Sequence, residues 1–164
     1  MRSVTLFVAG IAVGLAAQIA IAQSGNRGVA MMNHVGVNVP NIPEAVTYYT
    51  QKMGYKEAFR ATNDNGEPTL VYLHISRDTF LELQQATEQA PAGQLTHWGL
   101  ETPDIKATVA AFRQKGLMVS DPGAPSAFTG GILANVTDPV YGRIELSEQP
   151  AGGKLRAATE AWKE

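Results

Sequence analysis

The sequence predicts an α+β domain in which two βαβββ modules form one cup-shaped mixed sheet with helices outside. Three observations lead to this fold class: an internal repeat, strand and helix periodicities in the same order in each copy, and the chain length. With 164 residues and 45% hydrophobic content, the chain can build one core but not two independent ones. The two copies of the repeat are therefore expected to be halves of a single fold.

Two stretches, NHVGVNVPNI at 33–42 and THWGLETPDI at 96–105, share one skeleton at an offset of 63 residues. Across positions 32–54 the offset produces seven identities, where ordinary composition would produce roughly one or two. The same offset aligns Leu-Glu-Leu at 81–83 with Ile-Glu-Leu at 144–146. Each half therefore opens with a histidine and closes with a glutamate between two aliphatic residues.

The first module, residues 32–85, has the pattern of a strand, a helix and three further strands. Valine alternates with other residues from position 34 to 39, which is typical of a strand with one apolar face. A helix follows, with Asn41 as its N-cap and Gly54 at its end. Further strands are expected at 55–62, 70–76 and 79–84, before a linker at 85–94.

The second module, residues 95–148, repeats this order. Asp104 is the expected N-cap of its helix, and Gly116 the expected end. The loop at 121–131, rich in Gly, Pro, Ser and Ala, carries Phe128 as its one large apolar residue, and such a loop can close over a site. Strands are expected at 96–102, 117–120, 132–137 and 143–148.

The two ends of the chain lie outside the modules. Residues 1–22 have the pattern of a signal peptide: a basic start, an apolar run and small residues at a cleavage site. Residues 23–31 are then a linker, and the mature protein is expected to be periplasmic or secreted, without membrane contact. An uncleaved anchor and a later translation start at Met31 or Met32 are the alternatives.

The tail at 149–164 is expected to form a short helix. Leu155, Ala158 and Trp162 make its apolar stripe, which predicts docking on the back of the sheet or on a second subunit. The net charge of -2 and a pI near 5.9 exclude a nucleic-acid partner, because no basic patch is present. The expected partner is a small molecule.

Two histidines and two glutamates occupy matching repeat positions. His34 and His97 lie on polar strand faces, and Glu82 and Glu145 face away from their aliphatic neighbours. A carboxylate placed there needs a cation, a donor or water, and two imidazoles with two carboxylates satisfy a divalent ion. One histidine on a strand is usually structural, so the pairing carries the prediction; His74, whose repeat position is a threonine, is expected to be structural.

Residues 32–148 resemble the vicinal oxygen chelate superfamily, which includes glyoxalase I, fosfomycin resistance enzymes, extradiol dioxygenases and bleomycin-binding proteins. The segment DPVYGRIEL at 138–146 looks like the family's final turn and strand, DPxGxxIEL, with the glycine displaced by one. Residues 48–54 look like its FYxxxLG pattern. The resemblance implies a glyoxalase-like fold and one metal ion, with four ligands of the glyoxalase I type: His34, Glu82, His97 and Glu145.

The resemblance also implies an enzyme of the lyase or isomerase type. Its metal would be a divalent Ni, Co, Zn, Mn or Fe ion that binds two adjacent substrate oxygens and stabilises an oxyanion. Glu145, by its position, would be the catalytic residue that moves the proton. Members of the superfamily form the site within one chain or between subunits, so a homodimer is compatible with this repeat.

Two positions depart from glyoxalase I. Asn38 stands where an arginine usually binds the glutathione carboxylate, and Ala86 stands where an asparagine is usual. The expected substrate is therefore not the glutathione hemithioacetal, and Asn38 and Phe128 are candidate substrate-binding residues. The alternatives are an Fe(II) extradiol-type dioxygenase that needs His34, His97 and Glu145 only, and a non-catalytic ligand-binding protein of the bleomycin-resistance kind.

Overall fold

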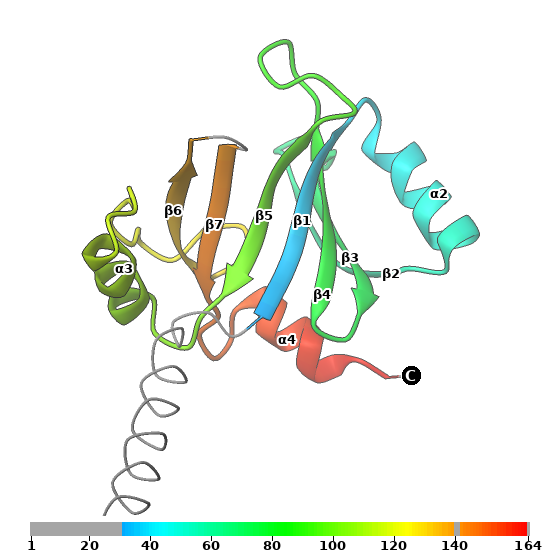
Figure 1. Ribbon diagram of the computed structural model, residues 1–164. Coiled ribbons are helices and arrows are strands. Elements are labelled where there is room, and N and C mark those ends of the chain that lie inside the picture. The colour runs from blue at the N-terminus through cyan, green and yellow to red at the C-terminus, as the bar shows by residue number, and fades with distance from the viewer. Residues whose placement is uncertain (1–30, 140–141, 164) are drawn as a thin grey trace, which may run out of the picture.

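The computed structural model describes residues 31–139 and 142–163, and the expected signal peptide at 1–22 lies outside them. Within the described residues, seven strands form one open mixed sheet, in the order β2-β3-β4-β1-β5-β7-β6 (Figure 1). The elements are β1 (Met31–Val39), α2 (Ile42–Met53), β2 (Lys56–Thr62), β3 (Pro68–Ser76), β4 (Thr79–Gln85), β5 (Leu95–Glu101), α3 (Ile105–Gln114), β6 (Ile132–Asp138), β7 (Gly142–Glu148) and α4 (Lys154–Ala161).

The two modules meet where β1 lies antiparallel to β5 in the middle of the sheet. On either side of this pair the arrangement repeats, because β1 lies parallel to β4 and β5 lies parallel to β7. Each histidine strand is therefore flanked by the other histidine strand and by its own module's glutamate strand. This architecture confirms the predicted fold class.

Helices α2 and α3 cover the outer face of the sheet, one over each module (Figure 1). Their starts match the prediction: the side chain of Asn41 accepts a hydrogen bond from the Glu44 N–H at 3.0 Å, and that of Asp104 from the Ala107 N–H at 2.9 Å. The buried aliphatic residues beneath α2 come from β3 and β4, and those beneath α3 from β6 and β7. Because strand side chains alternate, the polar residues between these aliphatics must point into the concave face.

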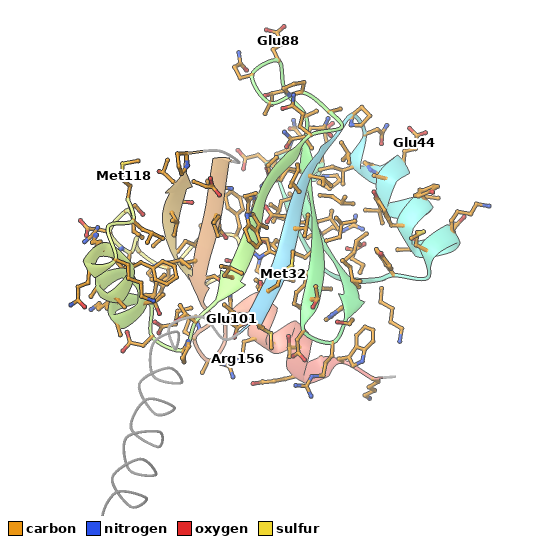
Figure 2. The ribbon with its side chains drawn as sticks, in the orientation of Figure 1. Met32, Glu44, Glu88, Glu101, Met118 and Arg156 are labelled. Carbon is orange, nitrogen blue, oxygen red and sulfur yellow. The ribbon has the colours of Figure 1, made fainter. Side chains whose placement is uncertain are left out.

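The strand predicted at 117–120 is wrong. The chain makes an isolated bridge there, between Val119 and Val136, and the N–H groups of Ser120 and Gly123 donate to carbonyls of β6 without forming a continuous strand. Met118 is 64% exposed and projects from the edge of the second module (Figure 2). The second module therefore contributes three strands to the sheet where the first contributes four.

Helix α4 also lies elsewhere than predicted. Its Leu155 is buried with Tyr72 and Phe80, on the face opposite to α2. The helix therefore covers part of the concave face and not the back of the sheet, because the aromatic side chains of the first module offer it an apolar surface there.

In the part of the chain that the structure describes, no helix combines the length and apolarity needed to cross a membrane.

Candidate metal centre

Two glycines bring the two histidines together across the central strand pair. His34 lies opposite Gly99, and Gly36 lies opposite His97. A Cβ on Gly99 would lie 2.0 Å from Cε1 of His34, and a Cβ on Gly36 would lie 2.5 Å from Cε1 of His97. Each ring thus lies over the glycine of the other module, which explains why the His-x-Gly pattern is repeated in the sequence.

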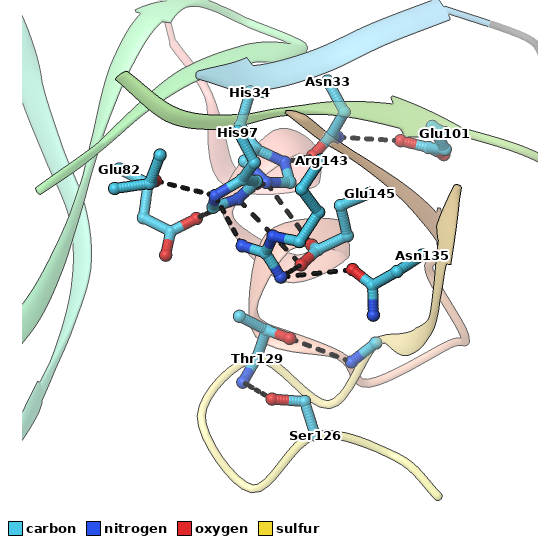
Figure 3. Close-up of polar contacts among 12 residues, drawn as sticks. Asn33, His34, Glu82, His97, Glu101, Ser126, Thr129, Asn135, Arg143 and Glu145 are labelled. Atoms are coloured by element: carbon cyan, nitrogen blue, oxygen red, sulfur yellow. Dashed lines mark hydrogen bonds and ion pairs between the residues drawn. The ribbon is translucent and has the colours of Figure 1, made fainter. Parts of the chain in front are cut away.

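The two glutamates reach the same place from the outer neighbours of this strand pair (Figure 3). His34 Nε2 lies 2.9 Å from His97 Nε2 and 3.4 Å from an oxygen of each glutamate, Glu82 and Glu145. His97 Nε2 lies 3.3 Å from Glu82 Oε2 and 3.9 Å from Glu145 Oε2. All four residues are at most 7% exposed, so one chain brings the predicted ligands together in a buried cluster without a partner subunit.

These distances fit a shared metal ion. Ligand atoms about 2.1 Å from a metal lie about 3.0 Å apart at right angles and about 3.4 Å apart in a tetrahedron. The separations between the histidine nitrogens and the carboxylate oxygens lie close to this range. Two imidazoles with carboxylates form a donor set that suits the divalent transition metals.

Glu82 differs from the other three residues. The ligating atoms of His34, His97 and Glu145 all lie within 4.8 Å of one another, and Glu82 is not part of that group. Its carboxylate instead accepts hydrogen bonds from the Tyr72 hydroxyl at 2.6 Å and from the Gln84 amide. All four residues therefore converge, since Glu82 Oε2 lies 3.4 Å from His34 Nε2 and 3.3 Å from His97 Nε2, but the Glu82 carboxylate is also held by hydrogen-bond donors of its own.

Burial acts on both members of the Tyr72–Glu82 pair. Burial raises the pKa of Glu82, but the hydrogen bond with His97 and the charges of both histidines outweigh burial and lower that pKa to about 2. Burial and the neighbouring Glu82 carboxylate raise the pKa of Tyr72 well above its usual value. Tyr72 therefore remains protonated and donates to an ionised Glu82 near neutral pH.

The residue before each histidine contacts its Nδ1 atom. Asn33 Oδ1 lies 2.8 Å from Nδ1 of His34, and the Asn33 amide donates to Glu101 at 2.9 Å, which fixes its orientation. An amide oxygen only accepts, so His34 carries its proton on Nδ1 and presents the Nε2 lone pair to the cluster. This is the tautomer that a metal ligand requires.

His97 has a similar neighbour and a competing one. Thr96 Oγ1 lies 2.8 Å from its Nδ1, and Arg143 Nη2 lies 2.7 Å from the same atom. A guanidinium only donates, so in this arrangement Nδ1 accepts and the ring proton is on Nε2. For His97 to bind a metal, Arg143 must release Nδ1, which can then donate to Thr96.

A cavity of about 200 Å³ opens beside the cluster. Its wall includes Arg143 and Gln149 together with Ser126, Phe128 and Thr129 from the 121–131 loop. The loop is held to the start of α4 by the hydrogen bond from the Lys154 N–H to the Thr129 carbonyl at 2.7 Å. The structure places Phe128 at the cavity, so its substrate-binding role stays a prediction, whereas Asn38 is buried on β1 and is not among the residues that line the cavity.

His74 lies on the same face of β3 as Tyr72 but at a distance from the cluster. Its ring packs against Phe80 and Trp162, at centroid distances of 4.6 and 4.8 Å, and its Nδ1 lies 3.2 Å from the Ser76 carbonyl. Burial lowers its pKa. The structure therefore gives His74 a packing role, in line with the prediction.

Sequence reasoning missed six residues of the site: Asn33, Tyr72, Gln84, Thr96, Arg143 and Gln149. The repeat could have identified Asn33 and Thr96, because they occupy matching positions directly before the two histidines. Arg143 stands two residues before Glu145 and so shares its face of β7, which strand periodicity indicates. Gln149 lies beyond the end of β7, and no sequence pattern identifies it.

Comparison with known proteins agrees with this geometry. The model of the Glyoxalase/Bleomycin resistance protein/Dioxygenase superfamily matches residues 31–146. The chain therefore belongs to this superfamily, whose fold and paired modules the structure shows. A comparison with curated protein sequences finds no match.

Solved structures of the same fold include epimerases and a dioxygenase. Methylmalonyl-CoA epimerase from Mycobacterium tuberculosis is 18% identical with a TM-score of 0.65, over 80% of this chain and 95% of that one. A Streptomyces coelicolor methylmalonyl-CoA epimerase variant in complex with 2-nitronate-propionyl-CoA is 20% identical with a TM-score of 0.60, over 75% and 99%. A 2,3-dioxygenase from Pseudomonas sp. KL28 is 18% identical with a TM-score of 0.62, over 76% and 43%.

Proposed function

We propose that this protein is a metal-dependent enzyme of the lyase or isomerase type, which acts on a small molecule with adjacent oxygens. The observation that carries this proposal is the buried group of His34, His97 and Glu145, with ligating atoms within 4.8 Å of one another, beside a cavity. A metal held there would polarise substrate oxygens and so acidify an adjacent C–H bond. Methylmalonyl-CoA epimerases among the similar structures support this reaction type, since epimerisation removes and returns a proton.

Glu145 is the residue best placed to move the proton. The Glu82 carboxylate is restrained by Tyr72 and Gln84, whereas Glu145 has Arg143 as its side-chain donor, at 3.4 Å. A general base must leave its resting partners and reach the substrate, and the less restrained carboxylate does so at lower cost. Glu145 also lines the cavity in which a substrate would lie.

We propose further that the protein acts outside the cytoplasm. The support is the signal-peptide pattern of residues 1–22, which lie outside the described part of the chain. Fractionation of cells that express the full chain, with N-terminal sequencing of the product, tests this. Recovery of an uncleaved protein from the cytosol would contradict it.

Metal content is the direct test of the proposed function. The purified protein, reconstituted with Ni, Co, Zn, Mn or Fe(II) and then desalted, is expected to retain one ion per chain by elemental analysis. His97→Gln should abolish retention, because it removes a central ligand, whereas His74→Gln should leave retention unchanged. A wild-type protein that retains no metal would overturn the proposal and would favour a non-catalytic ligand-binding role.

An Fe(II) dioxygenase is the second candidate, and the hydrogen bonds that hold the Glu82 carboxylate favour it. A three-ligand site of His34, His97 and Glu145 does not need Glu82 as a ligand. Glu82→Gln separates the two readings: loss of metal retention supports the four-ligand isomerase site. Unchanged Fe(II) retention together with oxygen uptake on a catechol supports the dioxygenase.

A further inference from the structure

We propose that the cavity beside the metal group binds a small carboxylate with an adjacent oxygen, a 2-oxo or 2-hydroxy acid, through Arg143 and Gln149. This inference rests on the proposed function and narrows its substrate class. Arg143 would bind the carboxylate, and the adjacent oxygen would face the group of His34, His97 and Glu145.

Arg143 is the one lysine or arginine among the residues that line this cavity. It shares the inner face of β7 with Glu145, so its guanidinium and the proposed ligands border the same space (Figure 3). A guanidinium pairs with a carboxylate through two parallel hydrogen bonds, which fixes the orientation of the acid as well as its charge. The acidic residues that line the cavity, Glu82 and Glu145, would repel an anion. The charge of Arg143 therefore favours an anionic substrate whose carboxylate binds at Arg143.

The hydrogen-bond acceptors of Arg143 in this structure can be replaced by those of a ligand. It donates to His97 Nδ1 at 2.7 Å, to Asn135 Oδ1 at 3.2 Å and to Glu145 at 3.4 Å. When His97 presents Nε2 to a metal, its Nδ1 carries a proton and no longer accepts from Arg143. Nη2 of Arg143 then loses its acceptor, and a substrate carboxylate in the cavity can take that place, while Nη1 keeps Asn135 and Glu145.

Gln149 provides the second, independent observation. Its residue is 5% exposed, and both its Oε1 and its Nε2 are buried without a hydrogen-bond partner among the described residues. A buried amide without a hydrogen-bond partner lowers the stability of the fold. Because this amide lies at the wall of a ligand cavity, we infer that a polar group of the ligand is its partner. Gly131 leaves room for this amide, since a Cβ there would lie 3.2 Å from both polar atoms.

The size of the cavity limits the carbon chain. About 200 Å³ corresponds to roughly seven water molecules, and so to an acid of a few carbons. Leu70, Leu133 and Leu155 provide apolar wall for a short alkyl group. Gln149 also borders a second cavity of about 360 Å³ with Arg77 and Arg156, but that space does not contain the metal group.

Binding of pyruvate and of pyruvamide, its uncharged analogue, to the metal-loaded full chain tests the inference. Calorimetry is expected to show tighter binding of pyruvate, and Arg143→Gln should weaken pyruvate roughly 10- to 100-fold without changing pyruvamide. Arg143→Lys, which keeps the charge but not the paired hydrogen bonds, should have an intermediate affinity. Arg113→Gln is the matched control, because Arg113 pairs with Asp121 away from the cavity, and it should bind both compounds as the wild type does.

Gln149→Met separates a ligand-binding role from a structural one. This variant should weaken pyruvate roughly 3- to 10-fold while its melting temperature stays the same or rises, because two unpartnered polar atoms are removed. Gln51→Met, an exposed change on α2, should alter neither property. A lower melting temperature with unchanged pyruvate affinity would assign Gln149 to the fold and overturn its part in the inference.

The outcomes distinguish this inference from the proposed function. A wild type that retains metal but binds pyruvate no better than pyruvamide overturns the inference and leaves the metal enzyme standing. Pyruvate binding that does not respond to Arg143→Gln overturns it too, because the second cavity would then be the binding place. Binding of a short-chain acyl-CoA with no binding of any free acid from three to six carbons would do the same.

Discussion

The two modules share one backbone plan but surround their glutamates differently. In the first module, Glu82 lies opposite Tyr72, whereas in the second Glu145 lies opposite Asn135 at the matching position. Arg143 in the second module stands where the first has Phe80. The first module therefore places the Tyr72 hydroxyl beside its glutamate and packs α4 on Tyr72 and Phe80, whereas the second places Arg143 beside its glutamate.

The two glutamates therefore differ in how firmly they are held, although the backbone around them is repeated. Both glutamates border the cavity, but Glu82 is held by hydrogen bonds from Tyr72 and Gln84 of its own module, whereas Glu145 has a longer contact with Arg143 at 3.4 Å. Features that both modules need are still duplicated, such as Gly36 with Gly99 and the helix N-caps. Substitutions at matching positions therefore reveal which properties are shared and which belong to one module.

The largest expected effect is that of Gly99→Ala. The added Cβ would lie 2.0 Å from the His34 ring, which is itself fully buried, so either the ring or the strand must shift. We expect a loss of about 3 kcal/mol in the free energy of unfolding, measured with urea, and at least a 100-fold loss of metal affinity. Gly36→Ala should act in the same direction but less strongly, because its nearest contact is 2.5 Å.

Gly123→Ala is the control for these glycine variants. Its Cβ would meet nothing closer than the Leu133 carbonyl at 3.8 Å, so neither stability nor metal affinity should change appreciably. If Gly99→Ala kept the metal affinity of the wild type, the crossed packing of ring on glycine would not be needed for the metal group.

The second prediction concerns acid stability of the metal-free protein. The folded-state pKa of Glu82 is about 2 against 4.5 for the free side chain, so the unfolded state binds more protons between these values. The stabilisation is complete above pH 4.5 and is lost as the pH falls towards 2, by about 3 kcal/mol at most. Urea unfolding at pH 6, 4 and 3 measures it, and Glu82→Gln should flatten the dependence. An equal slope in the variant would contradict the assignment.

The third prediction compares the residues that contact Nδ1 of the two histidines, Asn33 and Thr96. Asn33→Ala removes the acceptor that holds the His34 proton on Nδ1, and we expect a roughly 10- to 100-fold loss of metal affinity in a competition assay. Thr96→Ala should have a similar effect on His97, because Thr96 is the acceptor left to Nδ1 once Arg143 withdraws. Asn65→Ala, in the exposed turn before β3, is the control. A Thr96→Ala variant with full affinity would show that Thr96 is not the acceptor that Nδ1 of His97 needs when the metal is bound.

The smallest expected effects are equal in the two modules. Asn41→Ala and Asp104→Ala each remove one side-chain cap from a helix on the outer face. Each should lower the free energy of unfolding by about 1 kcal/mol and leave metal affinity unchanged. A change in metal affinity from either variant would show that the helices position the inner face more directly than the contacts indicate.

Most of the fold was predictable because it depends on local patterns. Alternating apolar residues, N-caps at Asn41 and Asp104 and helix-ending glycines act over a few residues, and the repeat supplied the pairing of the modules. The strand predicted at 117–120 was wrong because an apolar stretch does not specify how many of its residues will pair, and here a single bridge joins Val119 to Val136 of β6. The position predicted for α4 was wrong because an amphipathic stripe does not specify which apolar surface the helix will pack on.

The sequence by itself determined the paired histidines and glutamates, since a repeat places equivalent residues at equivalent points of a symmetric sheet. Only the tertiary structure decided how these residues differ. Contacts such as Arg143 with His97 and Tyr72 with Glu82 join different strands, and strand register, which no local pattern determines, sets their distances. The orphaned amide of Gln149 is likewise visible only once the neighbouring segments have folded around it.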